Sequence, residues 1–171
     1  HRRQVRCVVR NDGPGARGRQ DESAKGVERG GIGRAFCAAL GREGAAVACL
    51  DIDEEGRLDP RTIAAEITSR TRVVSLGHVS NALGTINPVR EAARLAHAVG
   101  AVVVVDGAQS APHLPIDVAE LGCDFFAFSG HKMCGPTGVG GLWGRRDLLE
   151  NMPPILGGGD MIDRVELEQS T

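Results

Sequence analysis

Long apolar runs are missing from this sequence of 171 residues. No stretch approaches the roughly 18 consecutive apolar residues that a membrane-spanning helix needs, and no apolar segment of a secretory signal follows the basic N-terminus. An excess of one charge is missing too, because 20 Lys and Arg stand against 22 Asp and Glu, for a net charge of −2. That balance gives no electrostatic case for nucleic acid or an anionic membrane as a partner. We therefore expect a soluble, cytoplasmic protein.

Paired cysteines are also missing. The five cysteines are an odd number, widely spaced and without a CxxC pair, which argues against a zinc ribbon and a disulfide framework. Cys37, Cys49 and Cys123 lie among apolar residues and are expected to be small buried hydrophobes. His78 and His131 have no evident third ligand, so no metal site is expected.

The sequence has the composition of a globular domain, with 42% hydrophobic and 25% charged residues. Its first 30 residues are rich in Gly and Arg and hold one short apolar cluster at Val8 and Val9. They are predicted to form a basic, disordered arm over 1–30, and residues 31–171 the folded part. Because the sequence begins with His1 and not Met, we expect it to be part of something longer.

Strand and helix patterns alternate beyond the arm. Short apolar runs typical of buried strands lie at 45–51, 72–76, 101–106, 124–128 and 139–143. Helical patterns lie at 32–42, after Pro60, from Pro88 to Gly100 and at 145–151. This alternation predicts an α/β fold, a mostly parallel sheet with helices on both faces.

Polar residues follow three of the predicted strands: HVSN (78–81), DGAQ (106–109) and SGHK (129–132). Ligands of an open parallel sheet bind beyond the carboxyl ends of its strands. These segments are therefore expected to meet at one edge of the sheet.

Lys132 is the informative residue at that edge. It lies in a glycine-rich loop beside Ser129 and His131, where backbone N–H groups and side chains can bind phosphate. A lysine at such a place can form a Schiff base with a carbonyl. The loop suits an aldehyde that carries a phosphate, and Asp106 fits the acid that pyridoxal phosphate (PLP) enzymes place against the pyridinium nitrogen.

Four segments together resemble one family: TRVVSLGHVSNALGTINPV, VVVVDGAQSAPHLPIDV, CDFFAFSGHKMCGPTGVGGLWG and ILGGGDMI, all within residues 56–162. They resemble the Suf-type cysteine desulfurases, in the class V, fold-type I, PLP-dependent aminotransferase superfamily. The resemblance implies conversion of L-cysteine to L-alanine and an enzyme persulfide, as a sulfur supply for iron-sulfur cluster assembly. It also implies a homodimer and a sulfur-acceptor protein as partners.

The resemblance implies that six residues bind PLP: Asn81, Asp106, Gln109, Ser129, His131 and Lys132. Lys132, the catalytic residue, would carry the cofactor as a Schiff base, and Asp106 would pair with the pyridine nitrogen. Gln109 and Asn81 would face the ring hydroxyl, with Asn81 also near the substrate. The remaining serine and histidine would hold the phosphate.

The sequence departs from that family in three places. The family's persulfide-forming cysteine and substrate-carboxylate arginine belong to a C-terminal part that does not occur here, and Cys134 is not in the catalytic-cysteine motif. The histidine that stacks on the cofactor ring would precede residue 45, where no such motif is found. We expect a partial PLP-binding large domain, without the C-terminal small domain.

A rival resemblance covers RGGIGRAFCAALGREGAAVACLDID (29–53), which is similar to the start of a short-chain dehydrogenase. Gly31 and Gly33 would approach a pyrophosphate, and Asp51 would hold a ribose. Polar residues stand where a strand should precede these glycines, and the sequence has no tyrosine for the YxxxK pair of that family. The alternatives left open are an NAD(P)-binding fragment and another class V aminotransferase or lyase.

Overall fold

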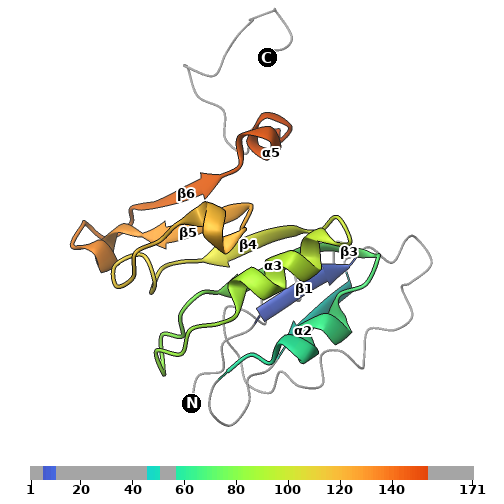
Figure 1. The fold of residues 1–171 in the computed structure, drawn as a ribbon. Helices are drawn as coiled ribbons and strands as arrows, with labels where there is room; N and C mark the ends of the chain where they lie inside the picture. Colours follow the sequence, from blue (N-terminus) through green and yellow to red (C-terminus); the bar gives the residue numbers. More distant parts are fainter. Residues whose placement is uncertain (1–5, 11–45, 51–56, 154–171) are drawn as a thin grey trace, which may run out of the picture.

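A computed structural model describes residues 6–10, 46–50 and 57–153. Six strands form one sheet in the order β2-β1-β3-β4-β5-β6 (Figure 1). The strands are β1 (Arg6–Arg10), β2 (Ala46–Leu50), β3 (Thr71–Gly77), β4 (Val102–Asp106), β5 (Phe125–Ser129) and β6 (Gly140–Gly144). Strands β3, β4 and β5 are parallel to one another, as their apolar runs predict. The α/β fold class is confirmed.

Two strands run against the others. β6 pairs antiparallel with β5, because only residues 130–139 separate the two strands and a parallel return needs a longer crossover. β1 pairs antiparallel with both β2 and β3. It lies within the segment 1–30 that the sequence predicts as an arm, so residues 6–10 depart from that prediction. The rest of the arm and the predicted helix at 32–42 lie outside the described residues.

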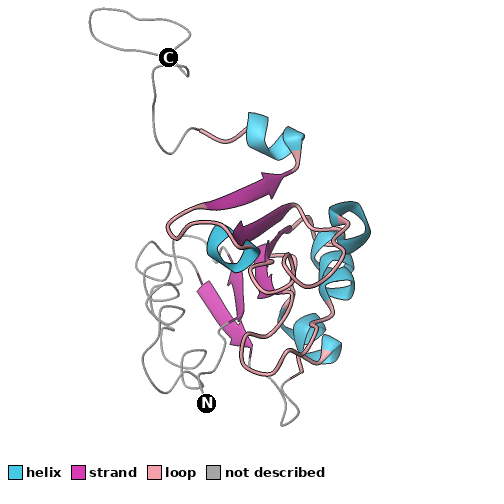
Figure 2. Ribbon diagram, turned by 90° about the vertical axis from the view of Figure 1, so that its left-hand side faces the viewer, coloured by secondary structure: helices cyan, strands magenta, loops and turns pink. Residues whose placement is uncertain are grey.

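The helices are α2 (Pro60–Glu66), α3 (Val89–His97), α4 (Val118–Leu121) and α5 (Arg146–Glu150), with a 3₁₀ helix η1 (Gly130–Met133). In Figure 2, α2 and α3 lie on the same face of the sheet. Asp59 caps α2 by accepting a hydrogen bond from the Arg61 N–H at 2.8 Å, and Pro60 occupies the first turn. No helix in the described ranges is long and apolar enough to cross a bilayer.

The core lies between the parallel strands and α3. Alternate residues of β3 and β4 are buried, which is the period of a strand with one face on a core. Three alanines of α3 face them, and their small side chains allow close packing. These core residues are Val74, Leu76, Val103, Val105, Ala92, Ala93 and Ala96, all at most 3% exposed.

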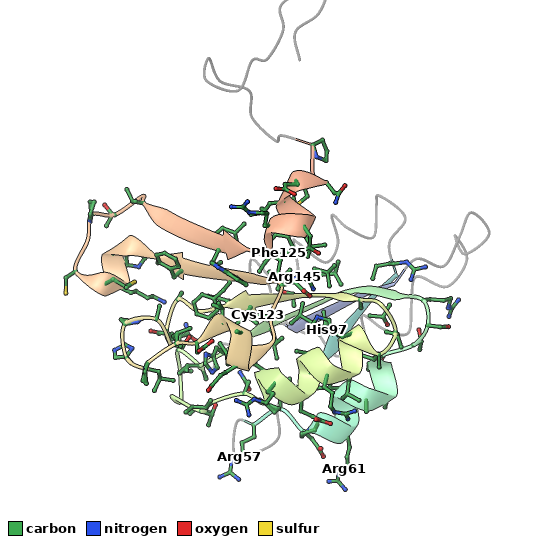
Figure 3. The ribbon with its side chains drawn as sticks, turned by 45° about the horizontal axis from the view of Figure 1, so that its top comes forward. Arg57, Arg61, His97, Cys123, Phe125 and Arg145 are labelled. Atoms are coloured by element: carbon green, nitrogen blue, oxygen red, sulfur yellow. The ribbon has the colours of Figure 1, made fainter. Side chains whose placement is uncertain are left out.

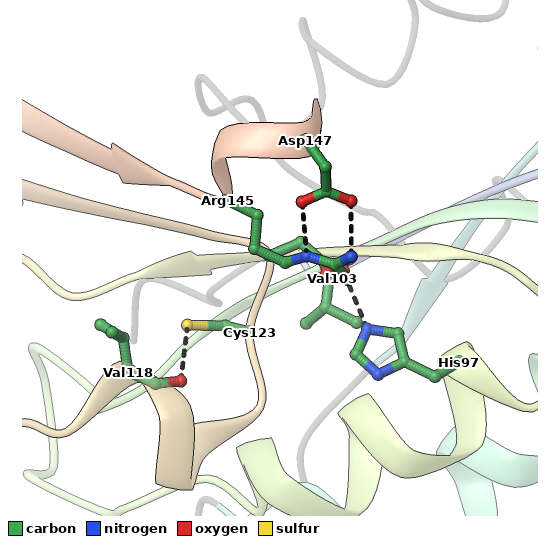
Figure 4. Close-up of polar contacts among 7 residues, drawn as sticks. His97, Val103, Val118, Cys123, Arg145 and Asp147 are labelled. Carbon is green, nitrogen blue, oxygen red and sulfur yellow. Dashed lines mark hydrogen bonds and ion pairs between the residues drawn. The ribbon is translucent and has the colours of Figure 1, made fainter. Parts of the chain in front are cut away.

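A buried carboxylate joins the elements at the amino ends of β4 and β5. Asp124 is 2% exposed, and its Oδ2 accepts hydrogen bonds from the Val103 N–H at 2.7 Å and contacts His97 Nε2 at 2.8 Å. Its Oδ1 accepts from Arg145 Nη1 at 2.8 Å, and Asp147 binds the other edge of that guanidinium at 2.6 Å (Figure 4). One carboxylate thus ties together α3, β4, β5 and the β6–α5 junction.

The position of this group is visible in the side-chain view. Figure 3 shows His97 and Arg145 near Phe125, while Arg57 and Arg61 lie at a distant part of the surface. Burial would raise the pKa of Asp124, but the hydrogen bonds from His97, the Val103 N–H and Arg145 outweigh it and hold the pKa below its usual 3.8. The ionised carboxylate is therefore the form that the fold stabilises.

We expect Asp124→Asn to lower the free energy of unfolding at pH 7 by about 3 kcal/mol, because it breaks a buried charged network. Asp124 has a lower pKa folded than unfolded, so its contribution is present above the unfolded-state pKa and is lost as pH falls through the folded-state pKa. The difference in the free energy of unfolding between the wild type and Asp124→Asn should therefore become smaller as the pH is lowered toward 3, as measured by urea titrations. Asp147→Asn is the control, since it weakens only an exposed, two-bond ion pair with the same arginine and should change stability much less. An equal loss in both variants contradicts the assignment.

Candidate functional site

The carboxyl ends of the three parallel strands lie side by side. Gly77 is in register with Asp106, and Asp106 with Ala127. The ladder extends one step further, because the His78 N–H donates to the Asp106 carbonyl at 2.9 Å and the Gly107 N–H to the Ala127 carbonyl at 2.7 Å. The loops that follow these strands all leave from the same end of the sheet (Figure 1). The polar segments predicted to share an edge do so.

Asp106 and Lys132 occupy neighbouring strand–loop junctions of this edge. Asp106 ends β4 with an exposed side chain whose Oδ1 accepts from the Ala108 N–H at 2.9 Å. Lys132 lies half-buried in η1, directly after β5. Within the described ranges, neither side chain forms an ion pair. Among the described residues, therefore, no charged side chain competes with a ligand for the carboxylate or the amine.

The loop that carries Lys132 is closed by glycines. The Gly130 N–H donates to the Val139 carbonyl at 2.8 Å, and the Gly135 N–H to the Gly130 carbonyl at 2.9 Å. A Cβ at Gly130 would lie 2.9 Å from the Val139 oxygen, and one at Gly135 would lie 2.9 Å from the Gly130 oxygen. Larger residues would force this loop open. Ser129 begins it, with its side chain half-buried at the end of β5.

The loop after β3 presents Asn81. The Ser80 N–H donates to the Thr85 carbonyl at 2.9 Å, and the Asn87 N–H to the His78 carbonyl at 2.8 Å, which makes the loop a narrow hairpin. Asn81 is exposed in its turn.

The loop after β4 carries Gln109, half-buried in a turn. The Gln109 carbonyl contacts Nδ1 of His113 at 2.7 Å, so the His113 side chain helps to shape this loop. Ser110 is fully buried and its hydroxyl donates to the Gly107 carbonyl at 3.3 Å. The turn is fixed by its own contacts.

The residues at this edge fit PLP by their chemistry. The cofactor has an aldehyde, a ring nitrogen, a ring hydroxyl and a phosphate, and the edge offers an amine, a carboxylate, two amides, a hydroxyl and an imidazole. His131 supplies the imidazole and is exposed on η1. The structure thus places all six predicted residues at one edge of the sheet, on the ends of β4 and β5 and in the segments that follow β3, β4 and β5. The role of each residue toward the cofactor stays a prediction.

Two groups at this edge owe their burial to packing that the sequence alone does not show. Asn87 is 3% exposed and precedes Pro88, where a single sequence shows only a loop residue. His78 belongs to the polar HVSN segment, but its burial, at 7% exposed, follows only from the packing. Burial lowers the pKa of His78 below its usual value of 6.5, so the imidazole is neutral at pH 7.

Neither the cysteines nor the metal-ligating side chains of the described residues form a second candidate site. In residues 57–153, with the two N-terminal strands, no group of three His, Cys, Asp or Glu side chains gathers as a metal site would. Cys123 is buried as predicted, and burial raises the pKa of its thiol. Cys134 is exposed after η1. Cys37 and the side chain of Cys49 lie outside the described part of the molecule.

Known proteins match this chain over most of its length. Residues 34–171 match the family model described as aminotransferase class-V. A probable cysteine desulfurase of Halalkalibacterium halodurans is 55% identical over 128 residues, which are 75% of this chain and 32% of that protein. The cysteine desulfurase of Haloferax volcanii is 54% identical over 130 residues, or 76% of this chain and 30% of that protein.

Solved structures agree with the sequence matches. The cysteine desulfurase CsdA (S-sulfonic acid) from Escherichia coli has a TM-score of 0.67 at 45% identity, over 70% of this chain and 30% of that one. SspA in complex with cysteine has a TM-score of 0.69 at 29% identity, over 75% of this chain and 38% of that one. The chain spans about a third of the length of these relatives.

Gly107 supplies a test of the site's packing. A Cβ at Gly107 would lie 2.0 Å from the Phe126 ring. We expect Gly107→Ala to lower the free energy of unfolding by about 1–3 kcal/mol, because the ring must move in a filled core. Gly77→Ala is the matched control at the end of the neighbouring strand, since its Cβ would meet nothing closer than 4.0 Å. Equal midpoints of thermal unfolding for the two variants would show that Phe126 does not confine this turn.

Proposed function

The chain belongs to the class V aminotransferase family, and from that membership we propose that it is the cofactor-binding part of a PLP-dependent cysteine desulfurase. One observation carries the proposal beyond the family. Asp106 and the Lys132 loop follow adjacent parallel strands, and neither charged group is paired with another side chain of the described residues. The carboxylate and the amine that this chemistry needs stand at the same edge of the sheet.

The reaction proposed is removal of sulfur from L-cysteine, with L-alanine as the product. The sulfur passes to an enzyme cysteine thiolate as a persulfide. Enzymes of this family use PLP, which when bound supplies an electron sink for the charge left at the substrate Cα. The names of the relatives support cysteine as the substrate.

Asp106 is assigned to the ring nitrogen. Its carboxylate holds a proton at that nitrogen, which makes the ring a stronger acceptor of negative charge. The hydrogen bond from the Ala108 N–H fixes one carboxylate oxygen and leaves the other free for this contact. The backbone of Asp106 lies between His78 and Ala127, so the side chain starts from a rigid position.

The other five residues bind and orient. Lys132 would hold the cofactor through Nζ at its aldehyde carbon, with loss of water, and the free Lys132 amine would be placed to take up a proton. Ser129 and His131 donate to the phosphate. Gln109 and Asn81 offer amide groups to the ring hydroxyl.

The same proposal covers the domain, the location and the partners of the complete protein. Residues 31–171 make up part of a PLP-binding large domain, and the complete protein acts in the cytoplasm as a homodimer. It hands sulfur to an acceptor protein for iron-sulfur cluster assembly. The family match from residue 34 onward supports the first of these statements, and the resemblance to Suf-type enzymes supports the others.

The alternative hypothesis, a dehydrogenase-like NAD(P) site in residues 29–53, is not favoured. The class V match already includes residues 34–53. β2, the one described element there, pairs antiparallel with β1 at the margin of the sheet. A dinucleotide site is built on parallel strands, one before its glycines and one after them. Another class V activity is also less well supported, because the similar relatives are named cysteine desulfurases.

Borohydride labelling tests the proposed function. The chain has only two lysines, Lys25 and Lys132. After incubation of the folded chain with PLP and reduction, we expect a phosphopyridoxyl group on Lys132, found by peptide mass mapping. The phosphate contacts should raise the local concentration of aldehyde at Lys132 and favour it over a lysine without them.

Three controls sharpen this labelling test. Lys132→Arg should abolish the label, and Lys25→Arg should leave it unchanged. Pyridoxal, which lacks the phosphate, should label Lys132 much less than PLP does. Label on Lys25 alone, equal label on both lysines, or no effect of the phosphate would refute the site. Each variant must also show a cooperative unfolding transition, which demonstrates that it is folded.

A further inference from the structure

Two buried polar atoms lie beneath the loop that presents Asn81. Nδ1 of His78 and Oδ1 of Asn87 are both inaccessible to solvent, and neither has a hydrogen-bond partner in the described residues. The two residues are 7% and 3% exposed. A buried polar atom without a partner costs roughly 1–3 kcal/mol, so native proteins satisfy such atoms with a protein group, a ligand or an ordered water.

The backbone keeps these two residues together. The Asn87 N–H donates to the His78 carbonyl at 2.8 Å, and Asn87 Nδ2 donates to the Gly77 carbonyl at 2.7 Å. The Asn87 side chain therefore runs back along the residue that precedes His78. Its Oδ1 is held on the same side of the loop as the histidine, at the base of the hairpin closed by the Val79–Ile86 bridge.

The hydrogen-bonding needs of the two atoms are ones that a single water molecule can meet. Burial keeps the His78 imidazole neutral, because it lowers the pKa of that group. A neutral imidazole has one acceptor and one donor nitrogen, while Oδ1 of an amide only accepts. A water can donate to Oδ1 and either donate to or accept from Nδ1, whichever tautomer is present. Such waters make about three hydrogen bonds to buried groups that otherwise lack partners.

We propose that His78 and Asn87 hold one buried water molecule and that this water-linked pair is a positioning element for Asn81. The pair lies at the base of the hairpin and Asn81 in its turn, so the water would fix the angle at which the hairpin leaves the sheet. The effect on Asn81 toward the cofactor rests on the proposed function. The water site itself does not.

Two histidine variants separate the roles of the ring nitrogens. Asn carries a polar atom on Cγ, as His does at Nδ1, whereas Gln places its polar atoms one bond further, near the position of Nε2. His78→Asn should therefore keep the water bond and His78→Gln should lose it. Amide hydrogen exchange of the chain without cofactor reports the result at the N–H groups of Ser80 and Asn87, both bonded within the hairpin.

We expect His78→Gln to lower the protection of these two amides about tenfold, the loss of one hydrogen bond's free energy, and His78→Asn to change it little. The Gly107 amide, bonded outside the hairpin, should stay protected in both. Leu83→Ala removes an exposed side chain of the same loop and should have no effect. Combining His78→Gln with Asn87→Ala should cost no more than Asn87→Ala alone, since both remove the same water. Equal effects of the two histidine variants would overturn the proposal.

Water itself can be detected in the wild-type chain. Magnetisation transfer from a long-lived water to the His78 ring is expected by NMR, and it should disappear in Asn87→Ala. Its absence in the wild type would refute the water site.

The cofactor gives the readout for positioning. In the chain loaded with PLP, we expect His78→Gln to shift the absorption maximum in the same direction as Asn81→Ala does. His78→Asn should leave the spectrum as it is in the wild type. A shift in Asn81→Ala without one in His78→Gln would overturn the positioning role. Failure of the wild type to bind PLP would contradict the proposed function, and the exchange experiment would still decide the water-linked pair.

Discussion

The buried carboxylate of Asp124 is the constraint on which the arrangement of this sheet depends. It takes hydrogen bonds from the β4 backbone and from Arg145 and contacts His97 on α3. A slip of one residue between β4 and β5 would withdraw Val103 from the carboxylate. It would also turn every side chain of the slipped strand to the other face. The register fixed at the amino ends is the register that sets Asp106 beside Ala127 at the other end. The site therefore inherits its geometry from a group that takes no part in its chemistry.

The two ends of the parallel strands differ in whether their buried polar groups have hydrogen-bond partners. At the amino end, each oxygen of the buried Asp124 carboxylate has a partner, and the guanidinium that binds it is held in turn by Asp147. At the carboxyl end, buried atoms of His78 and Asn87 have no partner among the described residues, and the Lys132 side chain has no ion pair among those residues. Satisfied buried groups stabilise a fold, whereas unpartnered ones favour a ligand that satisfies them. The unpartnered atoms thus lie at the same edge as the residues predicted to bind the cofactor.

Much of this arrangement follows from local sequence. The apolar runs of β3, β4 and β5 give strands whose ends the sequence predicts to within one residue, because the buried positions of these strands leave little choice of residue type. The edge of the sheet that carries the site follows from the polar segments after these strands. The position of β1 does not follow, because RCVVR has two adjacent apolar residues and its pairing with β3 spans more than 60 residues of sequence. The role of Asp124 does not follow from the sequence either, where it is only the first residue of the predicted strand 124–128. Its role appears only once α3 and the β6–α5 junction meet it.

The three loops of the site are each closed by bonds of their own backbone. The loop after β3 is closed by the Asn87–His78 bond, and the loop after β5 by the Gly130–Val139 bond. In the loop after β4, the Leu114 N–H donates to the Ser110 carbonyl at 2.9 Å. A loop that is ordered before binding does not lose conformational freedom when the ligand arrives, so more of the contact energy remains as affinity. The glycines serve the same end, since Gly130 and Gly135 permit the close backbone contacts that a Cβ would prevent. The rigidity of the site is thus a local property of three strand–loop units, and the sheet has only to hold those units in register.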